Sequence, residues 1–158
     1  MELVPIFFKL WSFSNIKITA GICSCRSGVP FKLAAEYAMQ DRVLKVLRVM
    51  VAHDENRYCF DCHQRGPTYV NITIGSFVCT NCGGALRKYN HRVKSISMSN
   101  FSSTEMDFLR KRGNKACRQI YLAQCEDLTV NERELDDAAR DEYLRQKYQL
   151  KKWSVCKA

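Results

Sequence analysis

The 158-residue sequence has no apolar run long enough to cross a membrane as a helix. Such a helix needs about 20 consecutive apolar residues, and the apolar opening of the chain is interrupted by Glu2, Lys9 and Lys17. This opening also lacks the basic start and clean apolar core of a secretory signal. Internal repeats and low-complexity tracts are absent as well. We therefore expect a protein that neither spans a membrane nor is secreted, with residues 1–30 as an N-terminal segment of unclear role.

The nine cysteines show no regular disulfide framework. Four of them stand in two close pairs, and the other five are scattered along the chain: Cys23, Cys25, Cys117, Cys125 and Cys156. An odd number of thiols, combined with a metal-type spacing, favours a reducing compartment. We expect a cytoplasmic protein, with the periphery of endomembranes or the nucleus as alternative locations.

Charge is unevenly spread along the chain, whose net charge is +9. Residues 57–98 hold six Arg or Lys and one acid, which gives +5. Residues 126–142 hold eight acids and two arginines, which gives −6, and the last sixteen residues return to +5. Basic segments of this kind favour an anionic partner, such as nucleic acid, an acidic membrane surface or a phosphate-bearing protein complex, although a solvated surface explains them too.

Cys59, Cys62, Cys79 and Cys82 form the pattern C-x2-C-x16-C-x2-C, and Arg87 follows the last of them after four residues. Each pair places two thiolates within reach of one ion, and the four complete the closed tetrahedral shell of a structural Zn²⁺ site. Because a closed shell has no open position for water, the zinc ion is expected to hold the fold together rather than catalyse a reaction. Any chemistry must then come from neighbouring residues, of which Arg87 is the first candidate.

Other interpretations of the two cysteine pairs explain less of the sequence. A redox dithiol needs only one pair. Four thiolates also suit iron, but zinc is the expected occupant. His63 and His91 are spare ligands that we expect at the surface. The main rival is a GATA-like nucleic-acid-binding finger, because basic residues follow the second pair: Arg87, Lys88, Arg92 and Lys94. The strand and two amphipathic helices expected after them exceed what such a finger needs, so no sequence-specific nucleic acid is expected as a partner.

The periodicity predicts an α+β fold, in which α-helices surround a small β-sheet pinned by the zinc finger. A first helix is expected over residues 31–52, where one apolar stripe runs along the chain: Val43, Leu44, Val46, Leu47, Met50 and Val51. Strands are expected over 70–74, 77–79 and 93–98 because apolar and polar residues alternate there, with a turn at Gly75. Gly83 and Gly84 are expected to let the backbone approach a thiolate closely.

The second half of the chain carries clear helix signals. Ser102 and Glu105 predict a capping box, and Phe101 and Met106 occupy the positions of a hydrophobic staple. Gly113 is expected to end this helix. Asn114 is expected to cap the next helix, in which one face is shared by Ala116, Cys117, Ile120 and Tyr121. A final helix is expected over residues 134–151, and the whole domain over residues 31–155.

The run CFDCHQRGPTYVNITIGSFVCTNCGGALRKYNHRVKSISM, residues 59–98, resembles the zinc finger of Arf GTPase-activating proteins. The segments RGPTYVN, GSFVCTNC and HRVKSISM are most similar to the subgroup called Arf-GAP domain and FG repeat-containing proteins. The resemblance continues through FSSTEMDFLRKRGNKACRQIY and YLRQKYQLKKW, and so covers about residues 45–153. Since the sequence carries no Phe–Gly repeats, we expect it to represent the Arf-GAP domain alone or a truncated product.

The resemblance implies a GTPase activator rather than an independent enzyme, acting in vesicle trafficking. It implies that Arg87 is an arginine finger supplied to a GTP-bound Arf-family small GTPase, where its guanidinium stabilises charge on the transferring phosphoryl group. From spacing alone, a solvated surface arginine explains Arg87 equally well.

Several positions depart from the wider family around this arginine. Tyr69, Tyr121 and Phe101 stand where Trp is usual, Leu86 replaces a common His, and the segment between Arg87 and the next strand is short. A catalytically weak or inactive interaction module of the same fold is therefore the alternative function.

Overall fold

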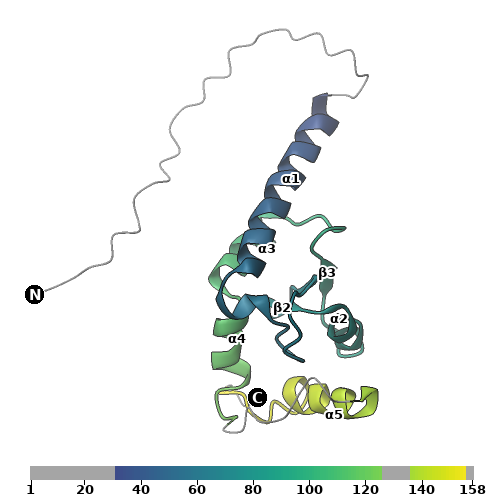
Figure 1. The fold of residues 1–158 in the computed structure, drawn as a ribbon, viewed down its shortest axis with the longest axis vertical. Helices are drawn as coiled ribbons and strands as arrows, with labels where there is room; N and C mark the ends of the chain where they lie inside the picture. The colour runs from purple at the N-terminus through teal and green to yellow at the C-terminus, as the bar shows by residue number, and fades with distance from the viewer. Residues whose placement is uncertain (1–30, 126–135, 156–158) are drawn as a thin grey trace, which may run out of the picture. The chain divides into compact units, whose positions relative to one another are not determined.

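The computed structural model describes residues 31–125 and 136–155 (Figure 1). In chain order the elements are α1 (Phe31–Ala52), the 3₁₀ helix η1 (Asp54–Arg57), β1 (Tyr69–Asn71), β2 (Ser76–Val78), α2 (Thr80–Arg87), β3 (Val93–Ser95), α3 (Ser103–Lys111), α4 (Asn114–Tyr121) and α5 (Asp137–Tyr148). Helices around one small sheet confirm the predicted α+β class. Among the described helices, none is both long and apolar enough to cross a membrane.

The sheet has three antiparallel strands in the order β2-β1-β3. In its centre, Val70 of β1 pairs with Phe77 of β2 on one side and with Lys94 of β3 on the other. Side chains alternate between the two faces of a strand, and Phe77 and its neighbour Val78 accordingly enter two different clusters of buried side chains. The small sheet thus separates two hydrophobic cores.

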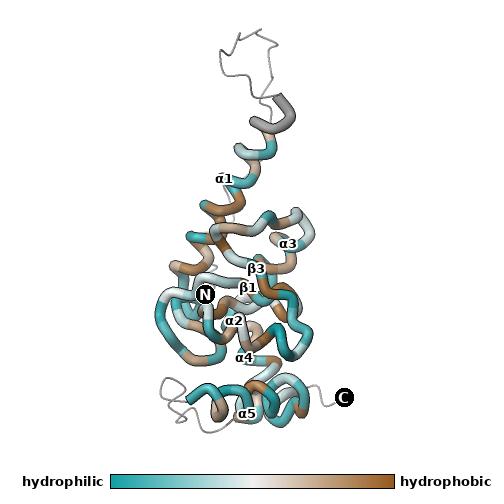
Figure 2. Tube along the Cα trace, turned by 90° about the vertical axis from the view of Figure 1, so that its right-hand side faces the viewer, coloured by the Kyte–Doolittle hydropathy of each residue, from teal (hydrophilic) through white to brown (hydrophobic). Residues whose placement is uncertain are grey.

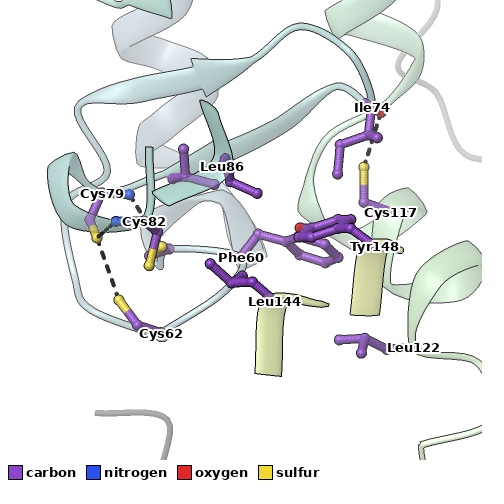
Figure 3. Close-up of a cluster of buried hydrophobic side chains, with 12 residues drawn as sticks. Phe60, Cys62, Ile74, Cys79, Cys82, Leu86, Cys117, Leu122, Leu144 and Tyr148 are labelled. Carbon is purple, nitrogen blue, oxygen red and sulfur yellow. Dashed lines mark hydrogen bonds between the residues drawn. The ribbon is translucent and has the colours of Figure 1, made fainter. Parts of the chain in front are cut away.

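The first core lies between the sheet, α1 and α3. It contains seven buried apolar residues: Leu47, Val70, Ile72, Phe77, Phe101, Met106 and Leu109. The second core lies on the cysteine side, where Phe60 and Leu86 meet Leu144 and Tyr148 of α5 (Figure 3). The first and the last helix therefore both pack on the sheet, α1 through the first core and α5 through the second.

Helix α1 has the predicted bounds and uses only its second half for packing. Leu47 is fully buried, and the half-buried side chains beside it also contact the first core: Val43, Val46, Met50 and Val51. The earlier turns extend beyond the other elements (Figure 2). Tyr37 and Met39 on these turns are exposed.

Two predicted strands are shorter than expected. The strand predicted over 70–74 ends at Asn71, because the Asn71 side chain accepts a hydrogen bond from Thr73 N and its carbonyl accepts one from Gly75 N. Gly75 has φ +86, a conformation that L side chains rarely adopt, which confirms the predicted turn. The strand predicted over 93–98 ends at Ser95, whose amide donates to Ser99 Oγ. Side-chain hydrogen bonds to the backbone replace ladder hydrogen bonds at both ends.

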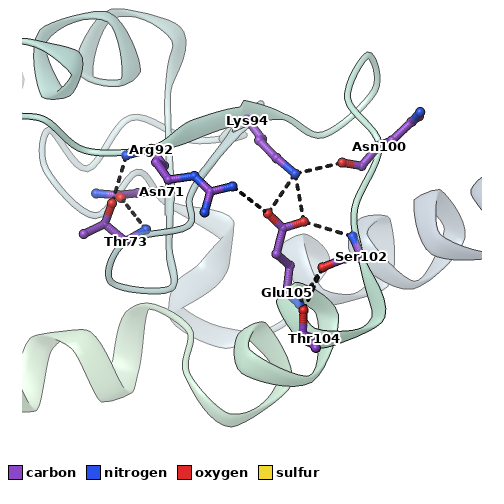
Figure 4. A network of polar contacts seen from close by, with 8 residues as sticks. All are labelled: Asn71, Thr73, Arg92, Lys94, Asn100, Ser102, Thr104 and Glu105. Atoms are coloured by element: carbon purple, nitrogen blue, oxygen red, sulfur yellow. Dashed lines mark hydrogen bonds and ion pairs between the residues drawn. The ribbon is translucent and has the colours of Figure 1, made fainter.

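The capping box of α3 is confirmed. Ser102 Oγ accepts a hydrogen bond from Glu105 N, and Ser102 N donates to a Glu105 carboxylate oxygen. Figure 4 shows that Glu105 also receives Lys94 Nζ at 2.8 Å and the Arg92 guanidinium at 3.2 Å. The Glu105 carboxylate in the first turn of α3 therefore also connects the edge strand β3 to this helix.

The prediction that Asn114 caps α4 is wrong. The N-cap is Gly113, with φ +95, and Asn114 is the first residue of the helix. The buried Asn114 side chain accepts from Phe77 N at 2.8 Å and donates to Tyr58 O at 2.7 Å. It thereby joins β2 to the segment before the first cysteine, although Asn114 lies 37 residues after Phe77 in the sequence.

The final helix is shorter than predicted, because Asp136 caps it by accepting a hydrogen bond from Ala139 N, and it ends at Tyr148. After it, the chain returns to α4, where Val155 N donates to Ile120 O. The expected domain limits of 31 and 155 stay a prediction. Residues 1–30 and most of the acidic segment 126–142 lie outside the described residues.

Candidate metal centre and the exposed arginine beside it

The four cysteines of the predicted metal site come together in the structure. Their sulfur atoms all lie within 4.8 Å of one another, and all four residues are buried. Backbone amides of the second pair support the cluster, since Cys79 N donates to Cys59 Sγ at 3.2 Å and Cys82 N donates to Cys79 Sγ at 3.4 Å. Figure 3 shows Cys62, Cys79 and Cys82 facing one another. Four buried thiols in this arrangement fit a tetrahedral structural ion.

Four thiols this close cannot all ionise without a cation between them. Hydrogen bonds among the thiols raise the pKa of Cys59 and of Cys82, and they lower the pKa of Cys62 and of Cys79. Coordination of a dication reverses this preference, because a metal-bound sulfur is a thiolate. The four clustered sulfur atoms are therefore suited to holding a metal.

The spare histidines do not join the cysteine cluster. The His63 ring stacks on Tyr58 with centroids 4.9 Å apart. Asn71 Nδ2 donates to His91 Nδ1 at 2.7 Å, and the His91 ring meets the edge of Tyr148 at 4.7 Å. Burial lowers the pKa of His91, so this ring stays neutral and accepts the hydrogen bond from Asn71. Both histidines are half-buried rather than at the surface as expected.

Gly83 has a different role from the one predicted. A Cβ atom on Gly83 would lie 3.2 Å from Val93 Cγ1 and 3.6 Å from the Tyr69 side chain. The glycine therefore lets α2 pack closely against β1 and β3, whereas the close approach to sulfur is made by the amides of Cys79 and Cys82.

Arg87 lies at the end of α2, the helix that begins immediately after Cys79. The N-cap of this helix is Cys79 itself. Leu86 is fully buried in the second core, while the Arg87 side chain is exposed. Its guanidinium carbon lies 5.8 Å from the centroid of the Tyr69 ring, within the range of a cation–π interaction.

The structure thus places Arg87 where a second protein can reach it. Within the described residues, its guanidinium has no hydrogen bond and no ion pair, unlike the guanidinium of Arg92, which contacts Glu105. The Tyr69 ring supports Arg87 from below, and the metal cluster lies at the start of the same helix. A fixed backbone, an unpaired cation and an exposed position are the properties required of a residue that acts on a partner.

Residues 44–157 match the model of the ArfGap family, described as "Putative GTPase activating protein for Arf". The chain belongs to this family. The sequence is 48% identical over 125 residues to Arf-GAP domain and FG repeat-containing protein 1 of Homo sapiens, which covers 77% of this chain and 22% of that protein. This Arf-GAP chain therefore spans about a fifth of the length of that relative.

Solved Arf-GAP domains share the fold. The structure titled "ArfGap domain of HIV-1 Rev binding protein" covers 78% of this chain and 95% of its own, with a TM-score of 0.69 and 46% identity. The human structure titled "Solution structure of the ArfGap domain of human RIP" covers 72% and 87%, with a TM-score of 0.66 and 50% identity. The family resemblance stated from the sequence is confirmed.

Within the Arf-GAP fold, the residues that depart from the wider family all have packing roles. Leu86 and Phe101 are buried in the second and the first core, respectively. Tyr121 packs against the second core, and Tyr69 lies under the Arg87 guanidinium. These substitutions keep an apolar or aromatic side chain at each place, so the fold accommodates them.

Sequence reasoning missed a buried ion pair beside the metal cluster. Asp61, between the first two cysteines, receives Lys147 Nζ at 2.8 Å and the Tyr148 hydroxyl at 2.7 Å, and all three residues are buried. Lys147 Nζ also donates to Phe60 O and lies 3.8 Å from the centroid of the Phe60 ring. Burial raises the pKa of Tyr148, which keeps its hydroxyl protonated as a donor. The one feature of the sequence that pointed to this ion pair was Asp61 itself, an acid inside the first C-x2-C pair.

Replacing Lys147 with methionine is expected to lower the free energy of unfolding by about 3–5 kcal/mol, because the Asp61 carboxylate is left buried without its cation. Denaturant unfolding of the metal-loaded domain measures the loss. Lys45→Met is the matched control, since Lys45 pairs with Asp41 on the exposed surface of α1 and such a pair contributes only about 0.3–0.5 kcal/mol. Equal, small losses for the two variants would contradict the importance of the buried pair.

Proposed function

We propose that this Arf-GAP domain accelerates GTP hydrolysis by an Arf-family small GTPase in its GTP-bound state, with Arg87 as the arginine finger. The observation that carries the proposal is an exposed guanidinium that makes no hydrogen bond and no ion pair with the described residues, held at the end of a helix that starts at the cysteine cluster. The family description and the names of the relatives support a GTPase as the partner. On this proposal the domain completes another protein's active site and performs no reaction by itself.

The proposed chemistry needs a permanent, oriented positive charge. Intrinsic hydrolysis is slow because negative charge develops on the transferring phosphoryl group and on the leaving oxygen, and an arginine finger stabilises that charge. Arginine suits this role because its guanidinium is always protonated and donates forked hydrogen bonds to phosphate oxygens. Placement at the end of an anchored helix reduces the orientational freedom that the side chain would otherwise lose on binding.

We further propose that Cys59, Cys62, Cys79 and Cys82 hold one Zn²⁺ ion. The support is the donor set, because four sulfur ligands in two C-x2-C pairs are typical of structural zinc. The ion would fix the relative positions of the two cysteine pairs. In this role the protein residues alone supply the groups that face the GTPase.

The direct test of the function is single-turnover hydrolysis by GTP-loaded Arf-family GTPases, with and without this domain. We expect an acceleration that saturates as the domain concentration rises, because the domain must bind before Arg87 reaches the nucleotide. Binding to the GTP-loaded GTPase without any change in hydrolysis would instead favour the second candidate, a non-catalytic interaction module. The observation that favours this second candidate is the replacement of the usual residues at Tyr69 and Leu86, next to Arg87.

A cytoplasmic location with transient contact to acidic membranes is part of the proposal. Its support is the group of exposed basic residues around the junction of α3 and α4, namely Arg110, Lys111, Arg112 and Lys115. Such a cluster is attracted to an anionic lipid surface. A GATA-like nucleic-acid finger has no further support, because the helices after the finger pack into one domain with it.

A further inference from the structure

Helix α5 contacts two segments of the chain, one between the first two cysteines and one just after Arg87. At its C-terminal end, Lys147 and Tyr148 bind Asp61 inside the first cysteine pair. Near its N-terminal end, Asp141 binds the two residues that follow Arg87. Between them, Leu144 is fully buried in the same core as Leu86 (Figure 3). One helix therefore holds both the first cysteine pair and the segment that carries Arg87.

The contacts of Asp141 lie immediately beyond Arg87. Lys88 Nζ forms an ion pair with Asp141 Oδ2 at 2.5 Å, and the Tyr89 hydroxyl donates to the backbone carbonyl of Asp141 at 2.7 Å. Tyr89 also packs against the second core. The pKa of Lys88 is raised, chiefly by its hydrogen bond to Asp141, so the lysine stays charged. Lys88 and Tyr89, which are consecutive in the sequence, therefore both bind Asp141 of α5. Lys88 does so through an ion pair and Tyr89 through a neutral hydrogen bond.

The backbone after Arg87 is tightly turned. Tyr89 N donates to Leu86 O at 3.0 Å, Asn90 N donates to Arg87 O at 3.2 Å, and His91 N also donates to Leu86 O at 3.3 Å. Asn90 has φ +61, which reverses the chain toward β3. Because Arg87 lies between the buried Leu86 and this turn, the position of the turn determines where the guanidinium can lie.

We infer that Asp141 is a positioning residue for Arg87, acting through Lys88 and Tyr89. This inference rests on the proposed GTPase-activating function. The side chains of Lys88 and Asp141 are 63% and 38% exposed, and exposed ion pairs contribute little to folding stability. The pair is therefore not needed to hold the domain together, which leaves orientation of the short segment after Arg87 as its effect.

The test measures variants of the metal-loaded domain in single-turnover hydrolysis by a GTP-loaded Arf-family GTPase. Three single substitutions are the starting point. Asp141→Asn removes the charge that holds Lys88, and Tyr89→Phe removes the hydroxyl that binds the Asp141 carbonyl. Glu142→Gln is the matched control, because Glu142 is the next acid on α5 and pairs with Arg145 of the same helix. All three variants keep the size of the side chain almost unchanged.

We expect the maximal rate at saturating domain to fall about 10-fold when Asp141→Asn and Tyr89→Phe are combined, which is less than the ~100-fold cost of a misplacement by 1 Å. The concentration for half-maximal acceleration and the melting temperature should stay close to wild type, and Glu142→Gln should change nothing. Exchange of the charges, Lys88→Asp with Asp141→Lys, should restore part of the lost rate. A purely structural role would instead lower the melting temperature along with the rate. An unchanged maximal rate would overturn the inference.

A second measurement separates this inference from the proposed function. The ¹⁵N–¹H nuclear Overhauser effect of the Arg87 side chain and of the amides of residues 88–90 reports their mobility without any GTPase. We expect greater mobility in the combined variant than in wild type or Glu142→Gln. If the wild-type domain does not accelerate hydrolysis, the proposed function fails while this readout still tests the coupling. Unchanged mobility in the combined variant would overturn it.

Discussion

Replacing Arg87 with alanine is expected to lower the maximal rate of single-turnover GTP hydrolysis by about 10³- to 10⁵-fold, the range that arginine fingers contribute. This loss corresponds to about 4–7 kcal/mol of activation free energy. Arg87→Lys should lose most of the same rate, because lysine keeps the charge but presents it on a compact, strongly hydrated group without the forked donors. Titration of each variant against a GTP-loaded Arf-family GTPase gives the maximal rate separately from the affinity.

The fold should not change in either Arg87 variant. The side chain is exposed, and among the described residues its only recorded partner is the Tyr69 ring. Melting temperature and metal content should therefore match wild type. Arg92→Lys is the control for charge on the same surface, since Arg92 is exposed and already engaged with Glu105. If all four proteins accelerate hydrolysis equally, Arg87 is not the finger and the non-catalytic function is favoured.

Removal of the metal, or replacement of Cys79 with alanine, is expected to unfold the region around the two cysteine pairs. Structural zinc in finger peptides binds with about 10–16 kcal/mol of apparent free energy at neutral pH, and this energy is coupled to folding. Cys79 is central, because its sulfur accepts a hydrogen bond from Cys82 N and its amide donates to Cys59 Sγ. Thermal unfolding before and after chelation, with metal content measured on each sample, tests the expectation.

Cys117→Ala is the matched control for the loss of a buried cysteine. Cys117 is fully buried, its thiol donates to Ile74 O at 3.3 Å, and burial raises its pKa to about 12. It lies outside the four-cysteine cluster, so the variant should bind one equivalent of zinc and remain sensitive to the chelator. A chelated wild-type domain that melts as before would show that the cluster does not support the fold.

Structural features that depend only on residues close together in the sequence were predictable from the sequence. The spacing of Cys59 and Cys62, and of Cys79 and Cys82, predicted the cluster, since a C-x2-C turn brings two sulfurs together by local geometry alone. The capping box at Ser102 was predictable for the same reason. The bounds of α1 also follow from local periodicity. By contrast, the strand beginning at Tyr69 stops early because an asparagine side chain competes with the ladder, and alternation alone does not reveal that competition.

Asn114 shows why local signals can mislead. An asparagine after a glycine at a helix start predicts a cap. The structure uses its amide instead to satisfy backbone groups of β2 and of the segment before Cys59. Such a choice depends on which buried backbone groups lack partners once the chain has folded, and this cannot be known from one segment.

The sequence by itself determined the four-cysteine cluster, the family and the candidate arginine, because these are carried by fixed spacings within a single stretch of chain. Only the tertiary structure decided what surrounds them. Asp61 meets Lys147 across 86 residues, and Lys88 meets Asp141 across 53. Neither contact follows from spacing, since it requires α5 to pack on the core formed by Phe60 and Leu86. Burial then makes the first pair strong by removing water, while exposure leaves the second pair to orient a loop rather than to stabilise the fold.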